Sequence, residues 1–390
     1  FNLLQSARVS TLSYRTLVSS SIVVFEFKGV KEDERQRASI QELLNTRKER
    51  TAMAKTALVI SGGGARGAFA VGALKEISKK VSFDLVAGTS TGALIAPLAA
   101  TGEIELLEKI YSLAETDKII KKNGGLNMVS VYTTQGLKSL IDSYIDDKRY
   151  KKILESSTQV FLATVNLTDG RIKYWNPKTS GKGGKEMTLE DFRNALLASA
   201  SIPILMPPIK IGKDFHVDGG VREVTPLSIA IEQKSDTIYA IILSAEKSTP
   251  KDIKLNGLMP IAEVALATID TLVQDVAEND IAMADLYNKS VVYFTALKER
   301  ARQLLSPAQV KQLFSSEVEN PVEDKRLLKL YKIRPETTLP ADALEFVPEK
   351  MKQMIKLGQE AAKKVVKTGP LEPSPQTFEE MLEEMRKELG

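Results

Sequence analysis

Apolar residues change their spacing several times along the chain, and these changes predict strands and helices that alternate from residue 57 onward. Short apolar runs predict strands at 57–61, 84–88, 159–166, 171–175, 237–244, 291–295 and 327–333, and a short hairpin at 210–217. Helical spacing predicts helices at 67–80, 89–100, 104–114, 136–145, 188–198, 226–233, 260–288 and 348–366. The opening strand, helix and strand form a βαβ unit, so the pattern indicates the α/β class.

The two ends of the chain differ from this pattern. Residues 1–52 are rich in Ser and carry no acidic residue before Glu26, and Met53 is the first methionine. Because Met53 leads straight into the first predicted strand, we interpret it as a natural start and 1–52 as an extension or read-through outside the fold. We expect one domain at 53–366 and a charged tail at 367–390. N-terminal sequencing of the native protein would test the first boundary.

Composition narrows the chemistry more than the fold. Apolar residues make up 43% and charged residues 27% of the chain, which is typical of a globular protein. Basic residues exceed acidic ones by 54 to 50, an excess too small to indicate a nucleic-acid partner. There is no cysteine and one histidine, His216, which argues against disulfides and against thiolate or His-rich metal sites. We therefore expect hydroxyl or carboxylate chemistry, with no metal and no cofactor.

The segment 61–67 has the features of a site for negative charge, because it joins a strand to a helix and is rich in glycine. Its glycines and its arginine are Gly62, Gly63, Gly64, Arg66 and Gly67. Glycines let successive N–H groups converge on an anion at a helix N-terminus. The spacing of Gly62, Gly64 and Gly67 also fits a dinucleotide-binding fingerprint. That interpretation needs an acidic residue at the end of the second strand, whereas Asp84 lies at its start.

The second predicted strand ends in a G-x-S-x-G motif, with Gly88 and Gly92 on either side of Ser90. Glycine at both positions permits a sharp turn from strand to helix, which exposes the serine hydroxyl. Because the carboxyl ends of parallel strands meet at one edge of a sheet, we expect Ser90 to face the segment 61–67. The two motifs together predict a nucleophile opposite an oxyanion hole.

Two residues compete for the role of base. Asp218 ends the predicted hairpin and precedes Gly219 and Gly220, and a partly desolvated carboxylate has its pKa raised toward useful basicity. His216 lies two residues earlier, so both side chains point to one face of the strand. Asp-Gly-Gly is also a common tight turn, and a lone histidine is more often structural. The residues alone leave the choice of base open.

In combination, these blocks resemble the patatin-like phospholipase family of bacterial-type serine acyl hydrolases. Residues 62–67 look like its oxyanion loop, 88–92 like its nucleophile elbow, 218–220 like its catalytic aspartate motif, and 198–203 like the helix end before that motif. The four blocks occur in the family's order, and the resemblance extends over about 57–366. One position differs, because Thr225 precedes Pro226 where the family often has Asn.

The resemblance implies a three-layer α/β/α fold around a mostly parallel sheet, and an acyl hydrolase of the phospholipase A or lysophospholipase type. It implies a catalytic dyad in which Ser90 attacks the ester and Asp218 accepts the proton, without a histidine. It also implies that the amides of Gly63, Gly64 and nearby residues hold the oxyanion, while Arg66 orders the loop. The expected partner is a phospholipid or another acyl lipid.

The sequence indicates less clearly which segments would contact a lipid substrate. The apolar faces of 104–114 and 136–145 fit either walls of an acyl groove or ordinary core packing, and we favour core packing. Lys178, Lys182 and Lys185 fit either headgroup contacts or a solvated loop, and we favour the solvated loop. No run of about 18 apolar residues predicts a transmembrane helix. We expect a cytoplasmic protein that is able to bind a membrane surface peripherally.

Two alternative functions are consistent with the same residues. The first is an ordinary α/β-hydrolase that uses His216 as the base. The second is a dinucleotide-binding protein that uses Gly62, Gly64 and Gly67. A catalytically silent lipid-binding homologue is a third, although intact Ser90 and Asp218 argue against it.

Overall fold

A computed structural model describes residues 54–124, 129–245, 260–314 and 327–369, together with two short paired strands, β1 (Val18–Ser19) and β2 (Ile22–Val23). The chain forms two compact units. The smaller unit comprises 1–50 and 295–315, and the larger one comprises 51–294 and 316–390. The predicted extension and charged tail lie almost entirely outside the described residues, so the predicted boundaries at 53 and 366 stay predictions.

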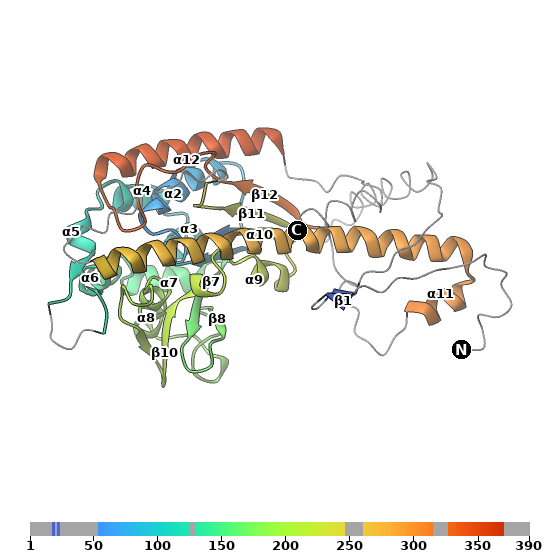
Figure 1. Cartoon of the computed structure of the whole chain (residues 1–390), viewed down its shortest axis with the longest axis horizontal. Helices are drawn as coiled ribbons and strands as arrows, with labels where there is room; N and C mark the ends of the chain where they lie inside the picture. The colour runs from blue at the N-terminus through green and yellow to red at the C-terminus, as the bar shows by residue number, and fades with distance from the viewer. Residues whose placement is uncertain are drawn as a thin grey trace. The chain divides into compact units, whose positions relative to one another are not determined.

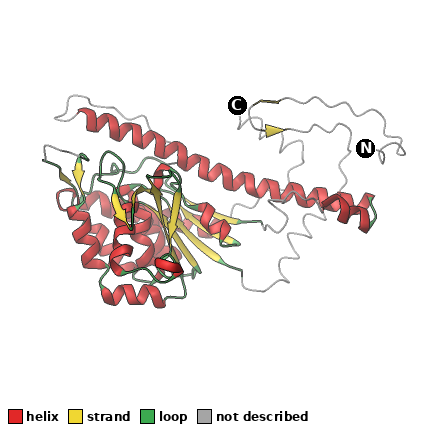
Figure 2. Ribbon diagram, turned by 90° about the horizontal axis from the view of Figure 1, so that it is seen from below, coloured by secondary structure: helices red, strands yellow, loops and turns green. Residues whose placement is uncertain are grey.

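An eight-stranded sheet forms the centre of the larger unit (Figures 1 and 2). Its strands are β3 (Thr56–Ile60), β4 (Leu85–Thr89), β7 (Gln159–Asn166), β8 (Ile172–Trp175), β9 (Ile209–Ile211), β10 (Asp214–Asp218), β11 (Thr237–Ile241) and β12 (Lys329–Ile333). Their order is β12-β11-β3-β4-β7-β10-β9, and β8 also pairs with β7. Neighbours from β12 to β7 are parallel, whereas β8 and β10 run antiparallel to β7. The predicted mostly parallel sheet is confirmed.

Helices cover both faces of this sheet. They are α2 (Gly67–Ile77), α3 (Thr91–Ala100), α4 (Ile104–Ser112), α5 (Thr116–Ile119), α6 (Gln135–Tyr144), α7 (Asp147–Glu155), α8 (Leu189–Ser199), α9 (Leu227–Glu232), α10 (Pro260–Leu304) and α12 (Pro348–Thr368). Single turns of 3-10 helix lie at η2 (Gly64–Arg66), η3 (Lys182–Gly184) and η4 (Gly219–Val221), and a separate small sheet pairs β5 (Lys121–Lys122) with β6 (Tyr132–Thr133). Helix α11 (Pro307–Phe314) belongs to the smaller unit.

Alternation along the central strands explains the layers. In β3, Leu58 and Ile60 belong to the apolar core that contains α2, α3, α4 and α12, whereas Ala57 and Val59 belong to the core that contains α9 and α10. All four side chains are fully buried. A strand that is apolar on both faces must be covered on both sides, so the three-layer α/β/α arrangement follows from its composition.

One predicted strand is wrong. The β-branched and aromatic run Val291–Thr295 lies inside α10, which continues to Leu304. No glycine or proline interrupts the chain between Pro260 and Pro307, so nothing in the sequence ends the helix before this run. Val291 is buried as part of a helix face. Strand propensity is weaker than this context, because it largely reflects packing on a pleated surface.

Across the part of the chain that the structure describes, no helix has both the length and the apolar composition needed to cross a bilayer.

Candidate active site

The register of three strands brings the ends of β4 and β10 together. Thr89, the last residue of β4, pairs with Ala163 of β7, and Asp218, the last residue of β10, pairs with Thr164. Because Ala163 and Thr164 are consecutive, the residue after Thr89 and the side chain of Asp218 reach the same place. The structure therefore brings Ser90 and Asp218 together, as the sequence predicted.

Ser90 occupies a strained turn between β4 and α3. Its φ of 55° and ψ of −123° lie outside the regions that non-glycine residues favour. The turn is possible because its neighbours lack side chains. A Cβ on Gly88 would lie 2.2 Å from backbone atoms of Gly92, and one on Gly92 would lie 2.2 Å from the carbonyl oxygen of Ile60. The predicted roles of both glycines in the turn thus have a steric basis.

A second serine, Ser199, holds the backbone of this turn in place. The backbone N–H of Ser90 donates to Oγ of Ser199 at 3.0 Å, and Oγ of Ser199 donates to the carbonyl oxygen of Ala163 at 2.6 Å. Ser199 is fully buried at the end of α8. The sequence showed the Ala/Ser-rich end of this helix, but gave no signal that one hydroxyl would hold the backbone of Ser90.

Asp218 is a buried carboxyl group whose pKa is raised to about 7. Burial is the largest cause, because it disfavours the charged form. A hydrogen bond from Ser90 and one from the N–H of Gly220, at 2.7 Å, act in the opposite direction. A carboxyl group with this pKa exchanges protons readily near neutral pH, as a general base must.

The two glycines after Asp218 have different roles, and Gly219 fits closely against β7. A Cβ on Gly219 would lie 2.6 Å from the carbonyl oxygen of Ala163, and Gly220 supplies the N–H that Asp218 accepts. Both therefore help to place the carboxylate.

The glycine loop before α2 has some N–H groups engaged and others available. Gly62 donates to the carbonyl oxygen of Val224 at 3.0 Å, Arg66 to that of Gly63 at 3.2 Å, and Gly67 to that of Gly64. Among the residues that the structure describes, the N–H groups of Gly63 and Gly64 have no acceptor. Both glycines line a cavity together with Ser90, so these two amides are the ones available to an oxyanion.

The remaining residues of this loop fix its position. Gly67 allows the start of α2 to approach α3, because a Cβ there would lie 2.3 Å from Oγ1 of Thr91. Nε of Arg66 donates to the carbonyl oxygen of Ala341 at 3.3 Å, and its guanidinium lies 3.8 Å from the carboxylate of Asp342. Arg66 therefore ties the loop to the segment before α12, in line with the ordering role expected for it.

A segment after Asp218 links the glycine loop, the turn at Ser90 and α10. The carbonyl oxygen of Val224 accepts from Gly62, and that of Glu223 accepts from Oγ1 of Thr89 at 3.0 Å. On its other side, one carboxylate oxygen of Asp280 in α10 accepts from the N–H groups of Val224 at 2.9 Å and Thr225 at 2.8 Å. Burial raises the pKa of Asp280 to about 7. No local sequence pattern marks Asp280 as part of the site.

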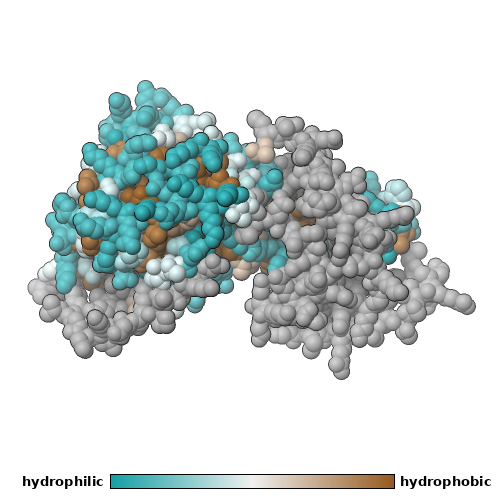
Figure 3. Space-filling view, turned by 90° about the horizontal axis from the view of Figure 1, so that it is seen from above, coloured by the Kyte–Doolittle hydropathy of each residue, from teal (hydrophilic) through white to brown (hydrophobic). Residues whose placement is uncertain are grey.

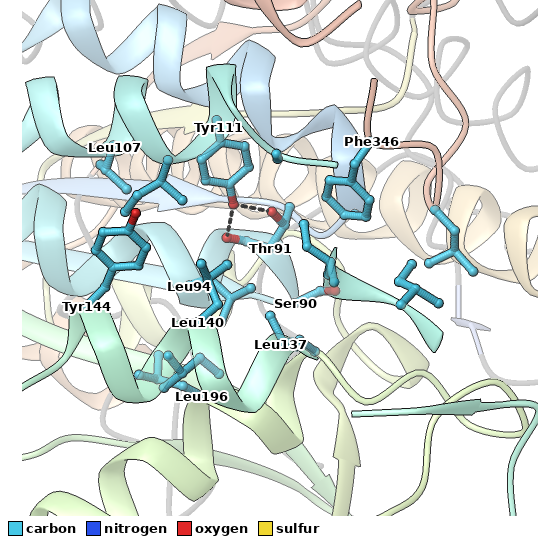
Figure 4. A pocket seen from close by; sticks show the side chains of 18 of the residues that line it. Ser90, Thr91, Leu94, Leu107, Tyr111, Leu137, Leu140, Tyr144, Leu196 and Phe346 are labelled. Carbon is cyan, nitrogen blue, oxygen red and sulfur yellow. Dashed lines mark hydrogen bonds between the residues drawn. The ribbon is translucent and has the colours of Figure 1, made fainter. Parts of the chain in front are cut away.

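Two cavities meet at Ser90 and Gly64. The inner cavity, of about 110 Å³, is lined almost entirely by apolar side chains (Figure 4). Its few polar groups include the hydroxyls of Thr91 and Tyr111, which lie 2.5 Å apart and satisfy each other. The outer cavity, of about 650 Å³, contains Asp218 and the glycine loop and extends along α10.

The walls of the inner cavity come from the helices that follow Ser90. Leu107 and Tyr111 lie in α4, whereas Leu137 and Leu140 lie in α6 (Figure 4). Core packing, which we favoured for these helices, holds for Leu107, Tyr111 and Leu137, and the same side chains line this cavity, so the acyl groove stays a prediction. In the lysine loop, Nζ of Lys178 is held by the carbonyl oxygen of Ser156, while Lys182 and Lys185 are exposed.

His216 and Asp84, the residues on which the two alternative functions depend besides the glycine loop, lie away from the cavities. Nδ1 of His216 is 3.1 Å from Oγ1 of Thr164, and its ring packs edge-on against Trp175. His216 lines neither cavity, and burial lowers its pKa. The carboxylate of Asp84 accepts from the N–H of Thr56 at 2.8 Å, at the start of β3 and β4 and so at the opposite end of the strands from Ser90.

The fold and this geometry define an α/β protein with a serine and a carboxyl group at the junction of two cavities. Residues 58–231 match the family model described as "Patatin-like phospholipase". The predicted resemblance is thereby confirmed for these residues.

Curated relatives share the same region. The chain is 29% identical over 209 residues to "Probable lipid hydrolase 463L" of Invertebrate iridescent virus 6, a match that covers 47% of this chain and 68% of that protein. It is 33% identical over 104 residues to "cUMP-AMP-activated phospholipase" of Escherichia coli, a match that covers 25% of this chain and 31% of that protein. It is 27% identical over 208 residues to "Lysophospholipase NTE1" of Eremothecium gossypii, which covers 51% of this chain and 13% of that protein. The chain thus spans less than a third of the last two relatives.

Proposed function

We propose that Ser90 and Asp218 carry out the lipid acyl hydrolase activity of this chain. The observation that carries the proposal is the placement of Ser90 next to the buried carboxyl group of Asp218, at consecutive positions of β7 and where the two cavities meet. The match of residues 58–231 to the patatin-like phospholipase family model supports an ester of a lipid as the substrate. The names of the relatives, lipid hydrolase and phospholipase, support the same class of reaction.

In the proposed reaction, Oγ of Ser90 attacks the carbonyl carbon of the ester while the carboxylate of Asp218 takes its proton. The tetrahedral intermediate collapses as Asp218 returns that proton to the leaving alcohol, and an acyl-Ser90 ester remains. Water then attacks this ester with Asp218 again as the base. The fatty acid leaves when the proton passes back to Oγ of Ser90.

The oxyanion forms next to the glycine loop. We assign its stabilisation to the N–H groups of Gly63 and Gly64, because those of Gly62, Arg66 and Gly67 already have acceptors. Amides that are fixed before the reaction stabilise developing charge without reorganising, and removing one such donor typically costs about two to three orders of magnitude in rate.

The two cavities suggest how the substrate is divided. The inner cavity suits an acyl chain, since its lining is apolar and Ser90 lies at its end. The outer cavity, which holds Asp218 and opens along α10, suits the alcohol part of the lipid. Peripheral binding to a membrane surface is part of this proposal, because the substrate resides there. The predicted compartment, the cytoplasm, stays a prediction.

The test is labelling with a fluorophosphonate probe, followed by peptide mass mapping and by hydrolysis of a soluble short-chain ester. We expect an adduct on Ser90 that is lost in Asp218→Ala and kept in His216→Ala. Loss of the adduct in His216→Ala alone would support the α/β-hydrolase alternative. Saturable NADPH binding without any adduct or ester hydrolysis would support the dinucleotide-binding alternative.

A further inference from the structure

Three neighbouring segments, one of which reaches the outer cavity, carry exposed apolar side chains. Leu167 follows β7, Phe215 lies in β10, and Val221 ends η4; they are 53%, 48% and 50% exposed. Large apolar side chains at this exposure, gathered at one place, mark an interaction site more often than single ones do.

Hydrogen bonds between the turns show that these residues form one surface. The N–H of Leu167 donates to the carbonyl oxygen of Phe215 at 2.9 Å. Nε of Arg222, next to Val221, donates to the carbonyl oxygen of Gly170 at 2.9 Å, in the turn between β7 and β8. In Figure 1, β8 and β10 lie together at the lower side of the view. We call this region the turn surface.

The turn surface is also basic. Its exposed cationic side chains are Arg171, Lys173, Lys210, Lys213 and Arg222. The acidic residues of the same turns are Asp169 and Asp214. Among the residues that the structure describes, none of the five cations has a carboxylate within ion-pair distance, although Nζ of Lys173 lies 3.7 Å from the centre of the Trp175 ring. The surface therefore combines uncompensated positive charge with exposed apolar side chains.

The turn surface is continuous with the outer cavity. Val221 lines that cavity, as do two further exposed apolar side chains, Ile204 at 62% and Leu272 at 59%. Ile204 has a φ of 71°, a conformation that is costly for a β-branched residue. An apolar rim around the cavity that contains Ser90 thus joins a basic apolar surface.

We infer that the turn surface is the face on which this protein binds an anionic lipid bilayer. The inference rests on the proposed function, because it names the surface through which that site meets its substrate. Apolar side chains enter the boundary between headgroups and acyl chains, and basic side chains are attracted to anionic headgroups. Bound in this way, the outer cavity opens toward the lipid, and an acyl ester reaches Ser90 without crossing water.

A second basic surface lies on α12, where Lys352, Lys356 and the 37% exposed Leu357 point outward. Figure 3 looks onto the side of α12, where hydrophilic side chains predominate. None of these three residues lines either cavity, so this face offers a control of similar composition but without a connection to Ser90.

The test measures binding of the full chain, in a Ser90→Ala background, to vesicles of phosphatidylcholine containing about one-third phosphatidylglycerol. We expect Leu167→Ser with Phe215→Ser to lower the partition coefficient at least about tenfold. We expect Arg171→Gln with Lys213→Gln to lower it by about the same factor and to weaken its dependence on salt. The matched control, Lys352→Gln with Lys356→Gln and Leu357→Ser, should bind like the parent.

Hydrolysis separates this inference from the proposed function. With Ser90 intact, the two turn-surface variants should lose hydrolysis of vesicle lipid but keep hydrolysis of a soluble short-chain ester, because none of the four residues lines a cavity. Vesicle binding that is equal in parent and variants, or lowered as much in the α12 control, would overturn the inference. If the parent hydrolyses no ester at all, the proposed function fails, while vesicle binding still decides the role of the surface. Thermal unfolding of each variant shows whether it is folded.

Discussion

The chemistry of Asp218 depends on a balance between burial and two hydrogen bonds. Burial alone would keep the carboxyl group protonated, whereas the bonds from Ser90 and Gly220 favour the carboxylate. The resulting pKa of about 7 leaves both forms populated near neutral pH. A side chain in this state accepts a proton from Ser90 and also returns it.

This balance predicts the pH dependence of hydrolysis. The carboxylate is the active form of a base, so kcat/KM for a soluble ester should rise about tenfold per pH unit below pH 7 and level off above it. Asp280→Asn provides the control, because Asp280 also has a pKa of about 7 but lies outside both cavities. If the acidic limb of the rate profile disappeared in Asp280→Asn, the titrating group would be Asp280 and not Asp218.

Gly64 gives a second prediction at the scale of single residues. It has a φ of 59°, and a Cβ there would lie 1.9 Å from the carbonyl oxygen of Ala343. Gly64→Ala should therefore displace the loop and lower kcat by about two to three orders of magnitude, as expected for loss of an oxyanion donor. Gly102→Ala is the matched control, because Gly102 has a φ of 72° with open space around it. Equal rates for both variants would show that the loop does not hold the oxyanion.

At the scale of elements, the carboxylate of Asp280 attaches α10 to the segment after Asp218. Asp280 accepts from the two N–H groups of Val224 and Thr225, and the same segment bonds Gly62 and Thr89. A helix that is distant in sequence therefore determines where the glycine loop and the turn at Ser90 lie.

Removing this carboxylate tests the connection. In Asp280→Ala the two N–H groups lose their acceptor, so the free energy of unfolding should fall by roughly 1–3 kcal/mol. We also expect kcat to fall about tenfold with little change in KM, because substrate contacts are intact while the catalytic groups shift. Asp280→Asn keeps an acceptor oxygen and should restore most of the rate. Asp285 lies on the same helix and forms an ion pair with Lys332 of β12, so Asp285→Ala should change kcat little.

At the scale of the whole molecule, the two cavities would orient a lipid substrate, with its acyl chain in the inner cavity and its alcohol part in the outer one. The inner cavity, of about 110 Å³, lies between Ser90 and the apolar faces of α4 and α6. Leu140→Trp in α6 should shorten this space and lower the ratio of long-chain to short-chain ester hydrolysis about tenfold. Leu113→Trp, at a position that is 57% exposed and outside the cavity lining, should leave the ratio unchanged. An unchanged ratio in Leu140→Trp would place the acyl chain elsewhere.

The sequence predicted those parts of the molecule that short segments determine. The turn at Ser90 depends on Gly88 and Gly92, which are local, and the alternation of strands and helices is local as well. The assignment of the oxyanion to the amides of Gly63 and Gly64 depends on which other amides of the loop have acceptors. One of these acceptors is the carbonyl oxygen of Val224, which lies far along the chain. The role of Asp280 depends on how α10 packs, which no local pattern reports.

The wrong prediction of a strand at 291–295 also arose because a local pattern does not report the longer element around it. The run 291–295 has strand-like residues, but only the uninterrupted length of α10 decides its conformation. The sequence also could not decide whether helices 104–114 and 136–145 line a cavity, because an apolar helix face has the same pattern whether it packs on a core or on an acyl chain.

The burial of Asp218 has a consequence for the end of the catalytic cycle. When the proton returns to Ser90, Asp218 is again a carboxylate, and the fatty acid beside it ionises to a second one. Two anions in a poorly hydrated site repel each other strongly. The enzyme would thus expel its own product by charge repulsion, and the primary amide of the fatty acid, which cannot ionise, would be a tighter inhibitor than the free acid above pH 7.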